Sequence, residues 1–209
     1  MPTPKRTSIS GLRDEGYREA MSQRYQRGET PWDTGVPIAE LIRAIDTGEL
    51  PGKTVLEMGC GTGTNSVELA RRGYVVTAVD LIEAPIQRAR ARAQDAGVKV
   101  DFRAGDLTRM DLGGPYDLLF DSGLYHGIRQ RDLAGFLAAL RQITRAGTRW
   151  LCLAGNANEP HPSGPPVVRE EEFRSELEPL FRILRLRQFR FDLGRDLQPL
   201  AWSILLERR

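Results

Sequence analysis

The sequence has few of the residues that form covalent cross-links or metal sites. Its 209 residues include two cysteines, Cys60 and Cys152, and two histidines, His126 and His161. Two cysteines do not make a disulfide framework, and neither histidine has a cysteine or another histidine at the spacing of a metal-ligand set. We therefore expect no metal ion and a reducing, cytoplasmic setting.

Long apolar runs and a large net charge are also missing. No apolar run approaches the roughly 18 residues of a membrane span, and residues 1–6 lack the apolar core of a signal peptide. The 30 basic and 28 acidic residues leave a formal net charge of +2. Because this balance gives no large basic field, and because the many arginines are scattered among acids, we expect neither a membrane nor a nucleic-acid partner.

A glycine-rich turn is the most informative feature that is present. Residues 55–63, Val-Leu-Glu-Met-Gly-Cys-Gly-Thr-Gly, predict a buried strand that runs into this turn, and Asn65 to Arg72 predicts a helix after it. Such a turn lets bare backbone approach a nucleotide-like ligand at a helix N-terminus. A second apolar run, Val75 to Val79, is followed by Asp80, and an acid at this place suits the hydroxyls of a ribose.

The spacing of the glycines argues against a dinucleotide. In the G-x-G-x-x-G fingerprint of nicotinamide and flavin sites the last position is a glycine, but counted from Gly59 or Gly61 it falls on Thr64 or Ser66. Glu57, just before the turn, is a poor neighbour for a phosphate and a good one for an ammonium group. A ligand with a ribose, an adenine and a positively charged end therefore fits better than one with phosphates.

Four motifs follow one another along the chain. They are E-x-G-x-G-x-G from Glu57, the acid Asp80, Gly105-Asp106-Leu107, and Tyr116-Asp117-Leu118-Leu119-Phe120-Asp121. In this order and at these separations they resemble the motifs of class I S-adenosylmethionine-dependent methyltransferases. The resemblance covers roughly residues 30–206 and implies S-adenosyl-L-methionine as the cofactor.

The predicted elements alternate between helix and strand, which implies right-handed crossovers and a parallel sheet. Besides those above, we expect helices at Leu12–Arg27, Ile38–Ile45, Ala84–Ala96, Arg131–Arg145 and Arg169–Leu180, and strands at Val98–Phe102, Tyr116–Asp121, Arg149–Ala154, Arg182–Asp192 and Leu200–Glu207. The resemblance implies an α/β, Rossmann-like, seven-stranded and mostly parallel sheet of order 3-2-1-4-5-7-6, with helices on both faces.

The length and a hydrophobic content of 40% suit one well-buried domain. We expect a flexible tail at residues 1–10, an N-terminal helical lid at 11–48 and a Rossmann-like core at 49–209. The lid around the acceptor is expected from residues 12–32 and from the proline-rich loop 156–168.

The resemblance assigns roles at the sheet edge where the strands end. It implies that the glycine turn approaches the methionine part and ribose, Glu57 anchors the amino group, Asp80 accepts the ribose hydroxyls, and Asp106 accepts the adenine amine. The full set of expected cofactor-binding residues is Trp32, Glu57, Gly59, Cys60, Gly61, Gly63, Asp80, Leu81, Asp106, Leu107, Asp121 and Ser122.

Two further stretches resemble a subgroup. Thr30-Pro31-Trp32-Asp33-Thr34-Gly35 is similar to a signature of thiol, halide and thiopurine methyltransferases, in which this segment folds over the cofactor and the tryptophan packs by its methionine end. Phe120 to His126 and the Gly-Pro-Pro-Val-Val run at 164–168 resemble stretches of bacterial relatives.

The candidate catalytic residues are His126 and Tyr125, which follow the fourth strand. Either could take a proton from the acceptor or hydrogen-bond it, and either could instead be a packing residue. We expect a methyltransferase that transfers its methyl group in line to a small molecule, most readily a thiol or similar soft nucleophile. O- or N-methylation of a natural product, RNA methylation and non-catalytic cofactor binding are the alternatives, and the oligomeric state is open.

Overall fold

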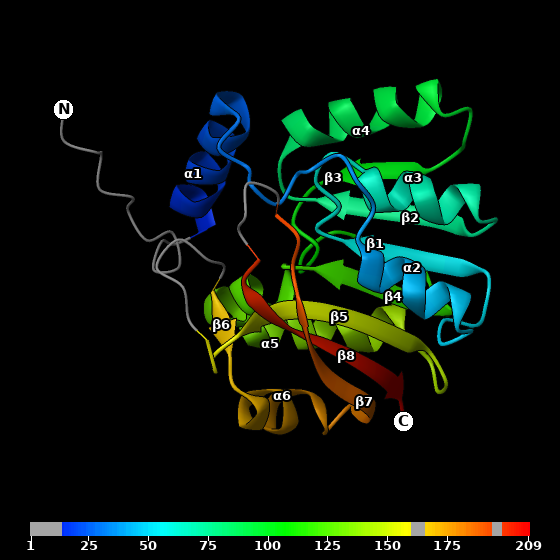
Figure 1. The fold of residues 1–209 in the computed structure, drawn as a ribbon, viewed down its shortest axis with the longest axis vertical. Helices are drawn as coiled ribbons and strands as arrows, with labels where there is room; N and C mark the ends of the chain where they lie inside the picture. Colours follow the sequence, from blue (N-terminus) through cyan, green and yellow to red (C-terminus); the bar gives the residue numbers. More distant parts are fainter. Residues whose placement is uncertain (1–13, 160–165, 194–197) are drawn as a thin grey trace.

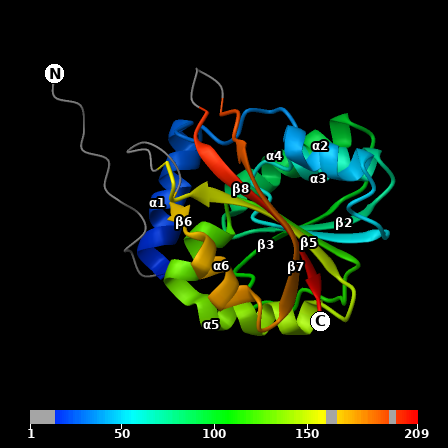
Figure 2. The ribbon, with the colours of Figure 1, turned by 60° about the horizontal axis from the view of Figure 1, so that its bottom comes forward.

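The computed structural model describes residues 14–159, 166–193 and 198–209. The expected tail at 1–10, His161 and most of the proline-rich loop lie outside these residues. In the described part, helices cover both faces of a single mixed sheet (Figures 1 and 2). No helix there is both long and apolar enough to cross a membrane.

The sheet of the described residues has eight strands in the order β3-β2-β1-β4-β5-β8-β7, with β6 paired to β5. The strands are β1 (Thr54–Met58), β2 (Val75–Asp80), β3 (Asp101–Ala104), β4 (Leu118–Ser122), β5 (Arg149–Asn156), β6 (Val167–Val168), β7 (Phe181–Arg190) and β8 (Leu200–Arg208). β1 to β5 run parallel, and β8 is antiparallel to both β5 and β7. Without the two-residue β6, which the sequence did not predict, this is the expected order, so the predicted topology is confirmed.

The helices form two layers on the sheet. They are α1 (Asp14–Arg27), α2 (Ala39–Asp46), α3 (Thr64–Arg71), α4 (Glu83–Asp95), α5 (Tyr125–Ile143) and α6 (Glu170–Leu177). Figure 2 shows α2, α3 and α4 on one face and α5 and α6 on the other. Each face has its own apolar core, with Leu41, Leu69 and Ile86 in one and Phe136 and Phe173 in the other.

A central strand covered on both faces needs apolar side chains on both sides. In β1, Val55, Leu56 and Met58 are buried as this rule requires. Glu57 is the exception, because its carboxyl group is equally buried at the end of the same strand. A buried acid in such a strand needs hydrogen-bond donors nearby, and it marks the edge at which β1 enters the glycine turn.

α1 lies beyond the carboxyl ends of the parallel strands, where Figure 1 shows the arrowheads pointing towards it. The Arg88 guanidinium of α4 donates to the Tyr25 carbonyl oxygen at 3.4 Å, which ties α1 to the body of the protein. α2 differs from the expectation that residues 11–48 form a lid. It packs on the sheet face beside α3, since Leu41 and Ala44 are fully buried in that core.

The helix expected from Arg131 starts earlier, at Tyr125. The side chain of Asp121 accepts the backbone N–H groups of Leu124 and Tyr125 at 3.1 and 3.0 Å, and so starts the helix directly after β4. The backbone then breaks at Asp132 (φ −154°, ψ 68°), whose carboxylate accepts the Gly135 N–H at 2.8 Å and caps a second helical segment. The sequence pattern detected this second segment alone.

The third strand is also shifted. It was predicted at 98–102 and lies at Asp101–Ala104, in register with Thr77–Asp80 of β2. Pairing with β2 sets this boundary, and such pairing is not visible in a local apolar pattern.

Candidate cofactor and acceptor site

The glycine turn adopts backbone angles that side chains disfavour. Gly59, Gly61 and Gly63 have φ of 74°, 54° and 76°, in the left-handed region that glycine enters without steric cost. A Cβ at Gly63 would lie 2.7 Å from the Ala89 Cβ and 2.8 Å from a ring carbon of Phe102. Gly63 is therefore needed for close packing on α4 and β3, whereas Gly59 and Gly61 leave backbone uncovered at the sheet edge.

Cys60 lies within the turn but faces the core. Its thiol is buried beside the apolar residues of the α2–α4 layer, and burial raises its pKa well above the usual range. The backbone N–H groups of Gly59 and Cys60 donate to the Val79 carbonyl oxygen at 2.7 and 3.0 Å. These bonds fix the turn against the end of β2, and a cofactor contact through Cys60 stays a prediction for its backbone.

Glu57 is held below the turn by the first turn of α3. Its carboxylate accepts hydrogen bonds from the Ser66 hydroxyl and, at 3.4 Å, from the Asn65 amide. Burial raises the pKa of Glu57 to about 7, although these two bonds act in the opposite direction. A buried acid with so high a pKa is suited to a cationic ligand, which would favour its ionised form.

Asp80 lies where the ribose is expected. One carboxylate oxygen accepts the Gly61 N–H at 2.9 Å and the other accepts the Ile82 N–H at 3.0 Å. Burial raises the pKa of Asp80. Two carboxylate oxygens have about four lone-pair positions, so two such bonds leave acceptor positions for a pair of hydroxyl groups.

A cavity of about 390 Å³ lies beside Asp80. Leu81, Ile82 and Gly105 line it from the ends of β2 and β3, and Arg18 and Ser22 of α1 close it from outside. The sequence placed the adenine against Leu81 and close to residues 105–107, which agrees with the position and largely apolar walls of this cavity.

Asp106 and Leu107 adjoin the same cavity. The Asp106 carboxylate accepts the backbone N–H and hydroxyl of Thr108 at 2.9 and 2.8 Å, which closes a local turn. Leu107 is buried in the α5 core. The second oxygen of Asp106 faces the Arg109 guanidinium at 3.6 Å, so adenine recognition by Asp106 remains a prediction.

Trp32 belongs to a segment that is fastened to the glycine turn. Its ring is 39% exposed and lies edge-on to Tyr25, with ring centroids 6.3 Å apart. The next residue, Asp33, accepts a hydrogen bond from the Thr62 hydroxyl at 2.6 Å. Tyr25 and Thr62 were missed by the sequence analysis, because a single tyrosine or threonine carries no pattern of its own.

Asp121 holds the protein together where a cofactor contact was expected. Besides the two N–H groups of α5, its carboxylate accepts the Trp150 indole N–H at 2.9 Å, and it is fully buried. Burial raises its pKa to about 6. Because its oxygens face these donors, the side chain positions the start of α5 and does not contact the ligand. Ser122, the last residue of β4, is only partly buried and stays a candidate.

Tyr125 is a core residue, which corrects its proposed catalytic role. Its ring stacks on Phe173 with centroids 5.1 Å apart and is fully buried. Its hydroxyl donates to Glu176 at 2.6 Å, and burial together with this acid raises its pKa far above the usual range. Tyr125 therefore has no free hydroxyl to offer to an acceptor.

His126 is buried at the carboxyl end of the sheet. Its Nδ1 accepts the Gly155 N–H at 3.1 Å, and burial lowers its pKa to about 4. The ring is thus neutral at pH 7, and the hydrogen bond assigns the remaining proton to Nε2. Nε2 points towards the loop after β4, 3.6 Å from where a Cβ at Gly123 would lie. His126 can donate a hydrogen bond there but has no free nitrogen lone pair with which to act as a base.

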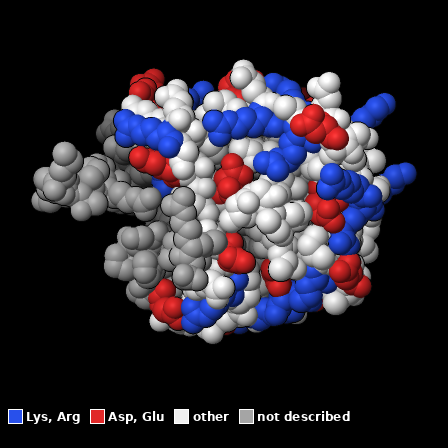
Figure 3. Space-filling view, turned by 45° about the horizontal axis from the view of Figure 1, so that its top comes forward, with Lys and Arg blue, Asp and Glu red and all other residues white. Residues whose placement is uncertain are grey.

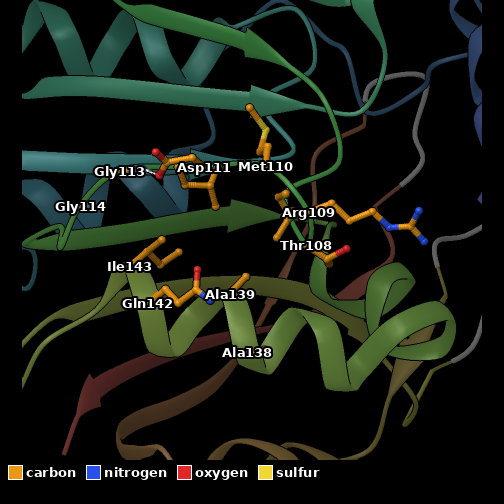
Figure 4. Close-up of a pocket in the computed structure, with 12 residues that line it drawn as sticks. Thr108, Arg109, Met110, Asp111, Gly113, Gly114, Ala138, Ala139, Gln142 and Ile143 are labelled. Carbon is orange, nitrogen blue, oxygen red and sulfur yellow. Dashed lines mark hydrogen bonds between the residues drawn. The ribbon is translucent and has the colours of Figure 1, made fainter.

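A second cavity, of about 440 Å³, lies outside this site. Figure 4 shows it between the β3–β4 connection and α5, with Arg109 and Thr108 at one end and Gly113, Gly114 and Ile143 towards the other. The described ranges contain no group of three acidic, histidine or cysteine side chains placed to hold a metal ion.

Comparison with protein families identifies residues 55–147 as matching the model of a methyltransferase domain. The chain is 28% identical over 172 residues to 2-heptyl-1-hydroxyquinolin-4(1H)-one methyltransferase of Mycobacteroides abscessus, covering 80% of this chain and 74% of that protein. It is 24% identical to the probable thiol methyltransferase 2 of Arabidopsis thaliana, covering 84% and 82% of the two chains.

Solved structures share the fold. A structure reported for the conversion of a disulfide bond into a thioacetal group during echinomycin biosynthesis matches with a TM-score of 0.77 and 25% identity over 91% of each chain. Magnesium protoporphyrin IX methyltransferase of Synechocystis PCC 6803, crystallised with bound S-adenosylmethionine, matches with a TM-score of 0.62 and 18% identity over 96% of this chain and 88% of the other.

Proposed function

Since the chain is a class I S-adenosylmethionine-dependent methyltransferase that acts on a small molecule, we propose that its acceptor atom is the sulfur of a thiol or a similar soft nucleophile. When bound, the cofactor supplies a methyl group activated by its sulfonium, and the carbon–sulfur bond that breaks leaves its electron pair on the cofactor sulfur. The acceptor sulfur forms the new bond, and the thiol proton is lost to solvent before the displacement.

One observation carries this proposal: the described residues at the end of β4 offer no general base. Asp121 faces four protein donors, Tyr125 donates to Glu176, and the accepting nitrogen of His126 is occupied by Gly155. A thiol with a pKa of about 8.5 is already a few per cent ionised at neutral pH. An ordinary alcohol would need a base to remove its proton.

The protein's own residues would bind and align the reactants. Glu57 and Asp80 present buried carboxylates towards the positions expected for the amino group and the ribose, and α1 closes the adenine cavity. The Nε2–H of His126 points to the loop after β4, where it can donate to an acceptor. Alignment of this kind contributes up to about 7–11 kcal/mol in well-oriented pairs.

The names of two relatives support sulfur chemistry, since one is a probable thiol methyltransferase and the other structure concerns a thioacetal. The Mycobacteroides relative is named for a 1-hydroxyquinolinone. The second candidate acceptor is therefore an acidic hydroxyl group, which also ionises without help from an enzyme base. On the face shown in Figure 3, basic and acidic side chains are interspersed, so this face offers no continuous basic surface to RNA.

Transfer of a labelled methyl group to thiophenol, phenol and aniline tests the proposal. We expect the thiol to react fastest, because it alone is appreciably ionised at pH 7. The pH dependence should follow the acceptor: with thiols of different acidity, the midpoint of the rate profile should move with the pKa of each thiol. A midpoint that stays at one pH for every acceptor would reveal an enzyme base and contradict the argument.

A further inference from the structure

Arg131 is a cation without an acidic partner near the expected acceptor position. Among the described residues it forms no ion pair, and its Nε is buried with no hydrogen-bond partner. Its guanidinium lies face-on over the Tyr17 ring, with Cζ 3.9 Å from the centroid. Arg129, on the same helix, differs clearly, because Glu172 and Glu176 both pair with it.

Tyr17 places this cation at the edge where the strands end. The Tyr17 hydroxyl lies 3.9 Å from where a Cβ at Gly127 would be, in the first turn of α5. Asp80 and Arg131 both act on the charge of Tyr17, so its ring lies between the ribose acid and Arg131. Figure 1 shows α1, which carries Tyr17, across the ends of the parallel strands.

The break in α5 fixes the position of Arg131. The first helical segment ends at this residue, and Asp132, immediately after it, turns its carboxylate to the Gly135 N–H at 2.8 Å. Asp132 therefore caps the second segment and does not neutralise its neighbour. A continuous helix would have no such interruption between Arg131 and the body of α5.

A guanidinium held by its face keeps the N–H groups of its edges free. These edges bind a carboxylate through two parallel hydrogen bonds, while the aromatic ring keeps the plane oriented. The need for a cation here is clear from the surroundings, because Glu57, Asp80 and Asp121 are buried at the same edge and would repel an anion. Arg131 provides the opposite charge on the acceptor side.

We propose that Arg131, oriented by Tyr17, binds a carboxylate of the methyl acceptor, so that the enzyme prefers an anionic acceptor to its neutral counterpart. This inference rests on the proposed function for the identity of the reacting site. It adds the chemical class of the remainder of the substrate, and its binding test does not depend on which atom is methylated.

The kinetic test compares para-mercaptobenzoate with its methyl ester. We expect the natural protein to show a higher kcat/KM for the acid, and Arg131→Met to lose about tenfold or more for the acid with little change for the ester. Arg131→Lys restores the charge without the planar fork and should recover only part of the preference. Arg141→Met, an exposed site on the same helix, is the matched control and should leave both rates unchanged.

A binding test separates this inference from the proposed function. Calorimetry of the complex with S-adenosylhomocysteine should show tighter binding of para-mercaptobenzoate and para-hydroxybenzoate than of their methyl esters, and Arg131→Met should abolish the difference. This result supports the inference even where no sulfur is methylated. Equal binding of acid and ester by the natural protein overturns it.

The cofactor also carries a carboxylate, which Arg131 could bind instead. S-adenosylhomocysteine alone should therefore bind to Arg131→Met with unchanged affinity. A loss of this affinity that matches the loss for the acids, with no discrimination between acid and ester, would assign Arg131 to the cofactor and overturn the inference.

Discussion

At the scale of single residues, the site is defined by which polar atoms are already occupied. Asp80 keeps free acceptor positions after two backbone bonds, whereas Asp121 faces several protein donors. His126 accepts through one nitrogen and can donate only through the other. The three residues are of types that catalyse reactions, yet their hydrogen bonds give them different roles.

Glu57 should couple cofactor binding to proton release. Its pKa is about 7 in the protein without ligand, and a cationic ligand nearby favours the carboxylate. Binding at pH 6 should therefore expel a proton, and affinity should rise as the pH increases through 7. Calorimetry in two buffers of different ionisation enthalpy measures this release.

The control is Glu57→Gln, which keeps the shape and removes the titration. Its binding heat should not depend on the buffer. If the natural protein also shows no buffer dependence at pH 6, the ionisation of Glu57 is not linked to the cofactor.

His126 should lower stability in acid. Its pKa is about 4 in the folded state against an ordinary value of 6.5, so below pH 6.5 the unfolded chain binds a proton that the folded protein does not. Stability should fall by up to about 1.4 kcal/mol per pH unit between pH 6.5 and 4. Urea unfolding over this range measures the effect.

His126→Asn, which keeps an acceptor for the Gly155 N–H, is the reference. Glu57 has the opposite linkage, since its raised pKa makes stability fall as pH rises from 4.5 to 7. The quantity to compare is therefore the difference between the natural protein and His126→Asn. A difference that is constant with pH would contradict a neutral, buried His126.

At the scale of elements, two segments cover the strand ends. α1 closes the cavity beside Asp80, and the segment after it is tied down by Asp33 on Thr62 and by the Ile38 N–H, which donates to the Asn65 side chain at 3.0 Å. These bonds join the chain before the sheet to the glycine turn and to α3. The cover should therefore respond to changes in the turn itself.

Thr62→Val should weaken cofactor binding with little loss of global stability. The substitution removes the 2.6 Å bond to Asp33 and keeps the shape of the side chain. A hydrogen bond of this kind is worth about 0.5–1.5 kcal/mol, so affinity for S-adenosylhomocysteine should fall by up to about tenfold. Thr47→Val is the control, because its hydroxyl bonds the Arg43 carbonyl at the end of α2, away from the turn. Unchanged affinity in Thr62→Val would show that the bond does not support the site.

At the scale of the whole molecule, two helical layers meet the sheet where the glycine turn passes between β1 and α3. Gly63 is in contact distance of both α4 and β3. The same closeness that leaves room for a ligand above the turn removes any room for a side chain below it. Stability and cofactor binding therefore depend on one glycine.

Gly63→Ala should be much more destabilising than Gly73→Ala. Both glycines have positive φ, 76° and 89°, which costs an alanine about 1–2 kcal/mol. At Gly63 the added Cβ would also lie 2.7 Å from Ala89, whereas at Gly73 nothing lies within 4 Å. Denaturant unfolding of the two variants isolates the packing cost as their difference. Equal losses would mean that α4 moves aside freely.

The sequence by itself determined the strand order, the glycine turn and the class of cofactor. These depend on local signals, namely apolar strands between helices, glycines at 59, 61 and 63, and acids at strand ends. Parallel strands bring their carboxyl ends together at one edge, so the position of an acid in the chain was enough to place it near the site.

Only the tertiary structure decided which of these side chains face a ligand. Asp121 and Tyr125 point into the protein because Trp150 and Glu176, distant in the chain, supply their partners. Arg131 and Tyr17 meet for the same reason, since α1 folds back over the start of α5. Orientation and pairing depend on contacts between remote segments, and no local pattern in the sequence encodes them.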